Sequence, residues 1–391
     1  MTGRTFQPRI WVALLVLAHW ACAGSAQVTD VGASMRKLVE ADWIERDRLF
    51  ADAMKSTEAC EFSLQHSQLL IAQGYRLAER LRVLSASGAR LQPLLTELRR
   101  VEARLAALQS ADDVPEGDRR SLYLDVRWTI RRIAFCNPLL DFDKILFIKR
   151  HHPGGVFHMC DQYYGFNAIA GGGLCVLADP FGPNPKLTDL LADAVVEKGR
   201  LEGRSLKGGA FLSPELSYDG DTILFAYTQA KGKDLEWTRE SCFHIFKVNA
   251  DGTGLVQLTD GPWSDFDPCF LPDGRIVFIS ERRGGYLRCG RHCPTYAMHS
   301  MAPDGSDIIR FSYHETHEWH PSVTNDGMIA YTRWDYVDRD TNIAHHIWTC
   351  FPDGRDPRSF HGNYPSRRES RPWMEMSIRA VPGSHKFVAT A

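Results

Sequence analysis

The feature that most constrains the fold is a repeat of about fifty residues in the C-terminal two-thirds of the chain. Each repeat opens with a proline, passes an Asp-Gly pair (Pro-Gly in the last repeat) and continues into a run of β-branched and aromatic residues. The opening prolines stand 51 to 54 residues apart, at Pro214, Pro268, Pro321 and Pro372. Asp-Gly pairs favour tight hairpins because glycine adopts positive φ at little steric cost. We therefore expect inner strands, each joined through its turn to the strand before it, at about residues 223–227, 276–280 and 328–332.

A second hairpin recurs in the same phase of each repeat. It is marked by the turns Asp251-Gly252, Asp304-Gly305 and Asp353-Gly354. Two hairpins give four strands, and a unit of about fifty residues with four strands is typical of a β-propeller blade. An earlier, degenerate unit starts at Pro138 and contains an insertion from His151 to Ala170. The fold class predicted is mainly β: a propeller with about five visible blade units, the last truncated. Either the chain is a fragment of a longer protein or a partner supplies the rest, and we favour the fragment.

The segment before the repeats is predicted to be α-helical from residue 31 to about 135. Seven apolar residues spaced for one face of a helix occur at Leu91, Leu94, Leu95, Leu98, Val101, Leu105 and Leu108. We expect further helices over 62–87, ended by Gly88, and over 119–135. A small bundle packing on the next domain is favoured over a dimerising coiled coil, because sustained heptads are too few. The expected domains are a helical region at 27–136 and a propeller at 137–391.

The first 26 residues have the pattern of a secretory signal peptide. Arg4 and Arg9 are basic, Ile10 to Ala18 is apolar, and small residues precede Gln27. The apolar run is too short to span a bilayer comfortably. An uncleaved anchor and lipidation at Cys22 are the alternatives. We expect a periplasmic or extracellular protein with no membrane span beyond the signal.

The net charge and the number of cysteines restrict the possible partners and the possible states of the thiols. The formal net charge is -2, which argues against nucleic acid as a partner. Ten cysteines are present, and cleavage of the signal would remove Cys22, leaving an odd number. At least one thiol is therefore free, metal-bound or paired between chains. A disulfide from Cys160 to Cys136 or Cys175 is as plausible from sequence as a ligand role for Cys160.

The repeats resemble those of TolB-like propellers, which are WD40-like in architecture. The resemblance rests on the Leu-Thr-Asp ending at 258–260 and the Asp-x-Asp-Pro segment at 265–268. More narrowly, residues 137–391 resemble the middle domain of the hydrazine synthase alpha subunit, through the segments 137–150, 159–163, 289–296 and 314–321. This resemblance implies a propeller that binds a protein partner or small ligand at its channel face. Hydrazine synthase itself carries c-type haems, whose attachment needs C-x-x-C-H. The sequence has no such motif, since three residues separate Cys289 from Cys293.

Two groups of residues could bind a transition metal. His314, His317 and His320 form H-x-x-H-x-x-H on the segment that joins one blade to the next, and imidazoles are common ligands of zinc, copper and iron. Cys289, His292 and Cys293 form the second group. Ordinary loop histidines, and a local disulfide or two packed thiols, are the structural alternatives. A metal site requires the imidazoles to converge on one point.

These patterns lead to three functional hypotheses. An exported binding or scaffold protein is the first. A metal- or haem-dependent redox enzyme related to hydrazine synthase is the second, and a polysaccharide hydrolase or lyase is the third. The last would need paired carboxylates in the channel. No G-x-x-x-x-G-K, G-x-S-x-G or H-E-x-x-H motif is present.

Overall fold

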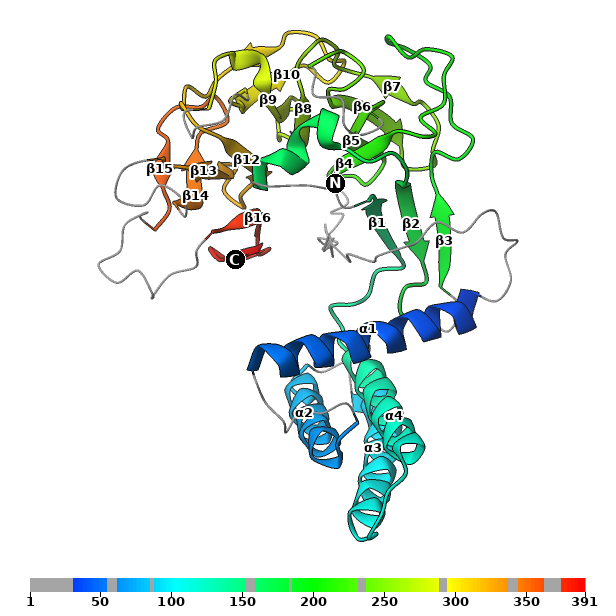
Figure 1. The fold of residues 1–391 in the computed structure, drawn as a ribbon. Coiled ribbons are helices and arrows are strands. Elements are labelled where there is room, and N and C mark those ends of the chain that lie inside the picture. Colours follow the sequence, from blue (N-terminus) through cyan, green and yellow to red (C-terminus); the bar gives the residue numbers. More distant parts are fainter. Residues whose placement is uncertain are drawn as a thin grey trace, which may run out of the picture.

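A computed structural model describes nine segments of the chain. They are residues 31–54, 62–84, 88–151, 159–182, 185–230, 237–287, 294–336, 344–361 and 374–390. Within them the chain forms a helical part and several antiparallel sheets, so the protein is mainly β after an α-helical start. The sheets follow one another around an arc, with the helices at one side (Figure 1). The predicted signal peptide at 1–26 lies outside the described residues.

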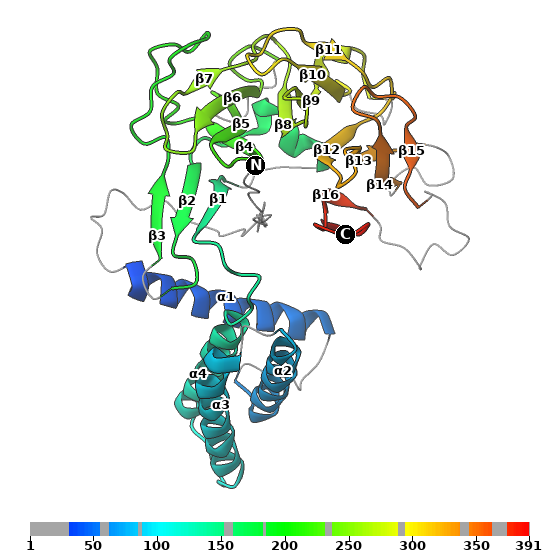
Figure 2. The same ribbon diagram turned by 180° about the vertical axis from the view of Figure 1, so that it is seen from behind.

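Four helices are described: α1 (Val31–Met54), α2 (Leu64–Arg82), α3 (Gly88–Gln109) and α4 (Glu116–Ala134). The predicted apolar face of α3 is buried against α2 and α4, which makes this part a bundle. The alternative coiled coil is not needed, because α2 and α4 already cover that face. Gly88 was expected to end a helix and instead begins α3. The first helix, α1, lies across the end of the bundle (Figures 1 and 2).

A polar cluster fastens α1 to the bundle. The carboxylate of Asp47 accepts hydrogen bonds from the Arg127 guanidinium at 2.6 Å and from the Tyr123 hydroxyl at 2.5 Å. Its Oδ2 also lies 3.0 Å from Nε2 of His66. Burial alone would raise the pKa of Asp47, but the hydrogen bonds from His66, Arg127 and Tyr123 outweigh burial and lower it. The cluster thus holds a charged carboxylate between three helices.

Five sheets correspond to the repeat units predicted from sequence. Their strands are β1 (Lys144–Lys149), β2 (Gly173–Ala178) and β3 (Lys186–Asp189); β4 (Ala210–Leu216), β5 (Thr222–Thr228), β6 (His244–Asn249) and β7 (Val256–Gln257); β8 (Asp265–Phe270), β9 (Ile276–Ser280), β10 (Ala297–Met301) and β11 (Ile309–Arg310); β12 (Glu318–Val323), β13 (Ile329–Trp334), β14 (His345–Cys350) and β15 (Arg358–Ser359); and β16 (Met376–Ala380) with β17 (Phe387–Thr390). Within each sheet the strands follow sequence order.

The three strands predicted after the Asp-Gly turns are confirmed as β5, β9 and β13. Their predicted position as inner strands is wrong. The strands nearest the centre of the arc are β4, β8, β12 and β16, which contact one another between sheets (Figure 1). The segment before each turn is itself a strand, because it pairs antiparallel with the segment after the turn. In the last four sheets the strand before the turn faces the centre, and in three of them that strand, β4, β8 or β12, carries the proline.

Each of these innermost strands contains a β-bulge at the same place. The bulge residues are Ser213, Asp267, His320 and Ser377, and each has φ between 48° and 52°. A proline follows the first three. Proline is tolerated at a bulge because the ladder does not need its missing N–H there. The last strand has an isoleucine after its bulge, so the last repeat is aligned on Ser377 and the alignment on Pro372 is wrong. Pro372 lies outside the described residues.

The described part of the insertion predicted in the first unit, residues 159–170, lies on the inner side of the arc (Figure 1). It contains the short 3-10 helices η1 (Met159–Tyr163) and η2 (Gly165–Asn167), which lie beside the innermost strands (Figures 1 and 2). Its side chains Tyr163, Tyr164 and Phe166 are buried in one core with residues of β8 and β12. The sheets therefore share a core that the chain's own insertion completes.

Candidate functional site

The four bulge residues form a polar belt around the centre, and we call Ser213, Asp267, His320 and Ser377 the inner belt. Oγ of Ser213 donates to Oδ1 of Asp267. The backbone N–H of His320 donates to Oδ2 of Asp267 at 3.0 Å. The backbone N–H of Ser377 donates to Nδ1 of His320 at 3.1 Å. Each belt residue is thus hydrogen-bonded to a belt residue of a neighbouring sheet.

The ring of His320 is fixed on both of its nitrogens. Because Nδ1 accepts from a backbone N–H, the proton of the neutral ring is on Nε2, which lies 2.7 Å from the hydroxyl of Tyr163. Nε2 is also 3.8 Å from Oδ2 of Asp267. Burial lowers the pKa of His320 and outweighs the opposing effect of Asp267. The inner belt therefore contains a neutral imidazole, that of His320.

The neutral state of His320 predicts a dependence of stability on pH. Below about pH 6.5 the unfolded chain binds a proton at this residue that the folded chain does not bind, so stability falls as pH falls. Asparagine tolerates positive φ and its Oδ1 can accept from the Ser377 N–H, so His320→Asn removes the titration while keeping that bond. We expect the slope of the free energy of unfolding against pH to be shallower in this variant, by at most about 1.4 kcal/mol per pH unit. Urea unfolding at several pH values between 5 and 8 measures the two slopes.

Other buried groups do not disturb this comparison. Burial lowers the pKa of His244 and His299, which act in the same sense, and raises the pKa of Glu215 and Glu318, which act in the opposite sense. These groups are present in both proteins, so their contributions cancel in the difference. Identical slopes in the two proteins would show that His320 is not neutral in the folded chain.

The other two histidines of the predicted metal group lie in different surroundings. Nε2 of His314 is 2.7 Å from the carbonyl oxygen of Trp334 and 2.6 Å from Oγ1 of Thr316. His317 is buried and stacks on Tyr296 with ring centroids 3.7 Å apart, and its Nδ1 accepts from the Tyr296 N–H at 3.3 Å. His314, His317 and His320 thus engage three separate sets of partners. Metal binding by these three residues stays a prediction, as does binding by Cys289, His292 and Cys293, which lie outside the described residues.

A carboxylate recurs where the third, fourth and fifth sheets each meet the sheet before them. The first residue of β8, Asp265, donates its N–H to the carbonyl of Phe243 at 2.8 Å, and the first residue of β12, Glu318, donates to Tyr296 at 3.3 Å. Glu375, just before β16, donates to His345 at 2.8 Å. Each acid also stands two residues before a residue of the inner belt. We call these positions the first, second and third junctions.

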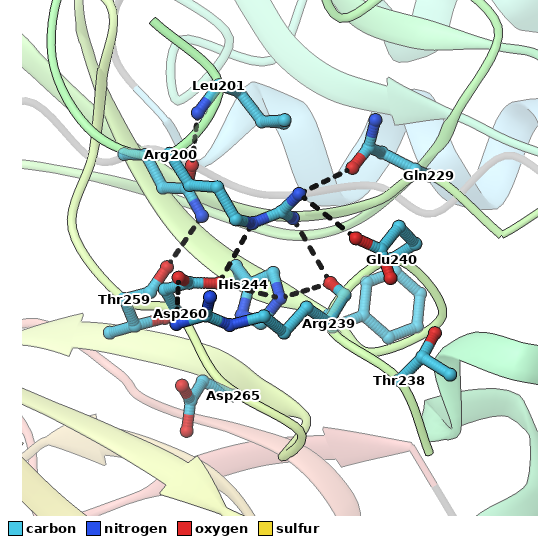
Figure 3. A network of polar contacts seen from close by, with 12 residues as sticks. Arg200, Leu201, Gln229, Thr238, Arg239, Glu240, His244, Thr259, Asp260 and Asp265 are labelled. Atoms are coloured by element: carbon cyan, nitrogen blue, oxygen red, sulfur yellow. Dashed lines mark hydrogen bonds and ion pairs between the residues drawn. The ribbon is translucent and has the colours of Figure 1, made fainter. Parts of the chain in front are cut away.

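The first junction is a network of ion pairs and hydrogen bonds. Asp265 accepts from Oγ of Ser280 at 2.6 Å and from the Arg282 guanidinium at 2.8 Å. Beside it, Figure 3 shows Arg200 extended between Gln229 and Asp260, at 3.0 Å from each. These acids are matched by arginines and by a hydroxyl, as in a structural network.

The second junction is simpler. Glu318 is buried and accepts from the backbone N–H of Met298 at 3.0 Å. Burial raises its pKa despite the hydrogen bonds that oppose the shift. No imidazole is hydrogen-bonded to Glu318 in the contacts that the described residues show.

The third junction differs because two imidazoles meet the carboxylate. Oε2 of Glu375 lies 3.0 Å from Nδ1 of His346 and 2.7 Å from Nε2 of His361. In the part of the chain that the structure describes, these residues form the one group of three or more metal-binding side chains, with their ligand atoms within 4.8 Å of one another. Sequence reasoning missed this cluster. Aligning the last repeat on Pro372 hid the equivalence of Glu375 to Asp265 and Glu318.

The cysteines of the described residues are buried, and no disulfide joins any two of them: Cys136, Cys160, Cys175, Cys242, Cys269 and Cys350. The disulfide considered between Cys160 and Cys136 or Cys175 is therefore not formed. Burial raises the pKa of Cys175 to about 11, which keeps this thiol protonated at neutral pH. These residues act as small apolar side chains in the core.

Comparison with known proteins finds remote similarity only. No protein-family model matches the chain. Dipeptidyl-peptidase 5 of Porphyromonas gingivalis is 26% identical over 118 residues, which cover 27% of this chain and 17% of that protein. Among solved structures, hydrazine synthase of Kuenenia stuttgartiensis matches with TM-score 0.41 and 17% identity over 58% of this chain and 32% of that chain. TolB of Acinetobacter baumannii matches with TM-score 0.35 and 14% identity over 71% and 57%. The chain spans less than two thirds of the length of each of these proteins.

None of the helices in the described segments combines the length and the apolar character that crossing a membrane requires.

Proposed function

We propose that the sheets are blades of a TolB-like β-propeller and that the protein is an exported binding or scaffold protein, similar to the middle domain of the hydrazine synthase alpha subunit. The observation that carries this proposal is the inner belt. Its polar groups are bonded to one another and to Tyr163 of the insertion, so they serve the frame rather than a reaction. Binding residues commonly lie on loops that a rigid scaffold positions. Export rests on the signal-like residues 1–26.

The loops that would meet a partner lie at one end of the sheets. The start of β8 pairs with the end of β9, and the start of β12 pairs with the end of β13. The connections into β8 and β12 and the connection out of β9 are therefore at the same end, which we call the loop face. It carries exposed aromatic side chains that are 38%, 61% and 72% accessible, at Trp263, Tyr286 and Tyr313. Such side chains offer apolar area with a polar tip, which suits recognition of a protein partner.

The aromatic side chains of the loop face supply the test. A variant with Trp263, Tyr286 and Tyr313 replaced by alanine is expected to fold normally, because these residues are exposed. We expect it to lose at least about tenfold in the recovery of a specific protein from the non-cytoplasmic fraction of the native host, since exposed aromatic anchors contribute about 1–2 kcal/mol each to association. Quantitative affinity purification with the wild-type chain in parallel measures the recovery.

The matched control is Tyr218→Ala. Tyr218 is also an exposed tyrosine, but it lies on the turn between β4 and β5, at the opposite end of the sheets. This variant should recover the partner as the wild type does. Undiminished recovery by the loop-face variant, or equal loss in both variants, would contradict binding at the loop face. The redox and polysaccharide alternatives stay predictions, and a haem held through C-x-x-C-H is not proposed because the sequence lacks that motif.

A further inference from the structure

The three junctions provide an internal comparison within one chain. Their acids, Asp265, Glu318 and Glu375, occupy equivalent positions, as the equivalent backbone hydrogen bonds show. At the first junction the acid is neutralised by arginine, and at the second it accepts from a backbone N–H. At the third the partners are two imidazoles. The surrounding frame is the same, so the imidazoles are not needed to close a junction.

The backbone at the third junction holds the three side chains in place. His346 is the second residue of β14. On one side of it, Glu375 donates its N–H to His345, and on the other side Phe360, the neighbour of His361, donates to Ile347 at 2.9 Å. Oγ1 of Thr332 donates to the carbonyl oxygen of Glu375 at 2.6 Å. The backbone at Glu375 and next to His361 is therefore hydrogen-bonded to the two neighbours of His346 on one strand, so little ordering is required before an ion binds.

The distances fit a small ion with tetrahedral ligands. Bonds of about 2.0–2.1 Å place the donor atoms of a tetrahedral zinc site about 3.3 Å apart. In the described structure, Oε2 of Glu375 is 3.0 Å from Nδ1 of His346 and 2.7 Å from Nε2 of His361. If the donor atoms moved apart by about half an ångström, the ion would fit between them. Two imidazoles with one carboxylate are a ligand set that suits divalent first-row transition metals.

The cluster is accessible from one side. The side chain of His361 is 37% exposed, whereas His346 is buried. Three protein ligands leave a fourth position, which in such sites is taken by water or by a substrate. The exposed edge at His361 would give a small oxygen-donor ligand, such as a carboxylate, access to that position.

We infer that His346, His361 and Glu375 bind one divalent transition-metal ion of the zinc type, with a fourth position open to water or a small oxygen-donor ligand. Each imidazole must present a nitrogen without a proton to the ion, so metal binding competes with protonation of the histidines and weakens at acidic pH. The site lies between the fourth sheet and the last one, and the ion therefore also fastens β16 to β14. This inference does not depend on the partner proposed for the loop face.

The test is a zinc titration of the purified full chain after treatment with a chelator. Isothermal titration at pH 7.5 is expected to show one equivalent of tight binding, and the temperature of unfolding should rise when zinc is present. Because His361 is partly exposed and glutamine is isosteric with glutamate, His361→Ala and Glu375→Gln should keep the fold. Each variant should lower the affinity for that zinc ion by about 100-fold or more, because a tetrahedral site loses one of its three protein ligands.

Two control variants test whether zinc binding depends on histidines outside this cluster. His244→Ala removes the buried histidine at the position in β6 that corresponds to His346 in β14, and it should leave zinc binding unchanged. His314→Ala tests the group predicted from sequence and should also leave it unchanged. Retention of the tight equivalent in both His361→Ala and Glu375→Gln, its loss in His314→Ala, or no stoichiometric binding by the wild type would overturn the inference and leave the cluster as a hydrogen-bonded support.

Discussion

Replacing Trp319 by alanine is expected to lower the free energy of unfolding by about 4 kcal/mol, in the range measured when a buried tryptophan is removed from a core. Trp319 lies on β12 and is fully buried. Its ring is within 6.5 Å, centroid to centroid, of Tyr163 in the insertion, Tyr296 beside β10 and His345 on β14. One side chain thus joins the insertion to two sheets, and the surrounding rings cannot collapse into the space it leaves.

Urea unfolding followed by far-UV circular dichroism measures this loss. Trp319→Phe is the control, because phenylalanine keeps an aromatic ring and should cost only about 1–2 kcal/mol. The alanine variant should unfold at a markedly lower urea concentration than the control. A loss below about 1 kcal/mol in Trp319→Ala would contradict a core that runs through the centre of the arc.

Replacing Asp267 by alanine is expected to lower the free energy of unfolding by about 3 kcal/mol. The carboxylate is buried and accepts from Oγ of Ser213 and from the N–H of His320. Without it, the buried N–H of His320 loses its partner, which costs about 1–3 kcal/mol. Alanine must also adopt the left-handed conformation, φ 48°, which costs about 1–2 kcal/mol.

The variant Asp267→Asn separates the cost of the lost hydrogen bond from the cost of the left-handed backbone conformation. Asparagine tolerates the left-handed conformation and retains one acceptor oxygen, so we expect a loss of about 1 kcal/mol. Chemical unfolding of the two variants and of the wild type gives the comparison. Equal losses for alanine and asparagine would show that the belt hydrogen bonds contribute little to the connection between sheets.

Strand positions were predictable because their signals are local. An Asp-Gly pair between apolar runs sets a hairpin within about ten residues, and β5, β9 and β13 lie where that signal places them. The prolines that follow Ser213, Asp267 and His320 likewise marked the same position in each repeat. Sequence did not reveal that this point is a bulge with positive φ, or that the strand carrying it is innermost. Both depend on contacts between sheets, which a repeat pattern does not contain.

The third junction could not be predicted from spacing. His346, His361 and Glu375 come from three segments, and their side chains meet only because the backbones on either side of β14 bond to it. The reverse holds for His314, His317 and His320, whose regular spacing suggested a site. There the chain enters β12 at Glu318, and the rings are directed to separate partners. Regular spacing alone does not give these three rings a common partner, and metal binding by them stays a prediction.

The most direct measurement of the central claim, that a repeated structural frame carries one metal-binding junction, is anomalous X-ray scattering at the zinc edge from crystals of the full chain grown with one equivalent of zinc. The expected result is one strong peak within about 2.0–2.2 Å of Nδ1 of His346, Nε2 of His361 and a carboxylate oxygen of Glu375. The first and second junctions should show none. A peak among His314, His317 and His320, or no peak at the third junction, would contradict the claim.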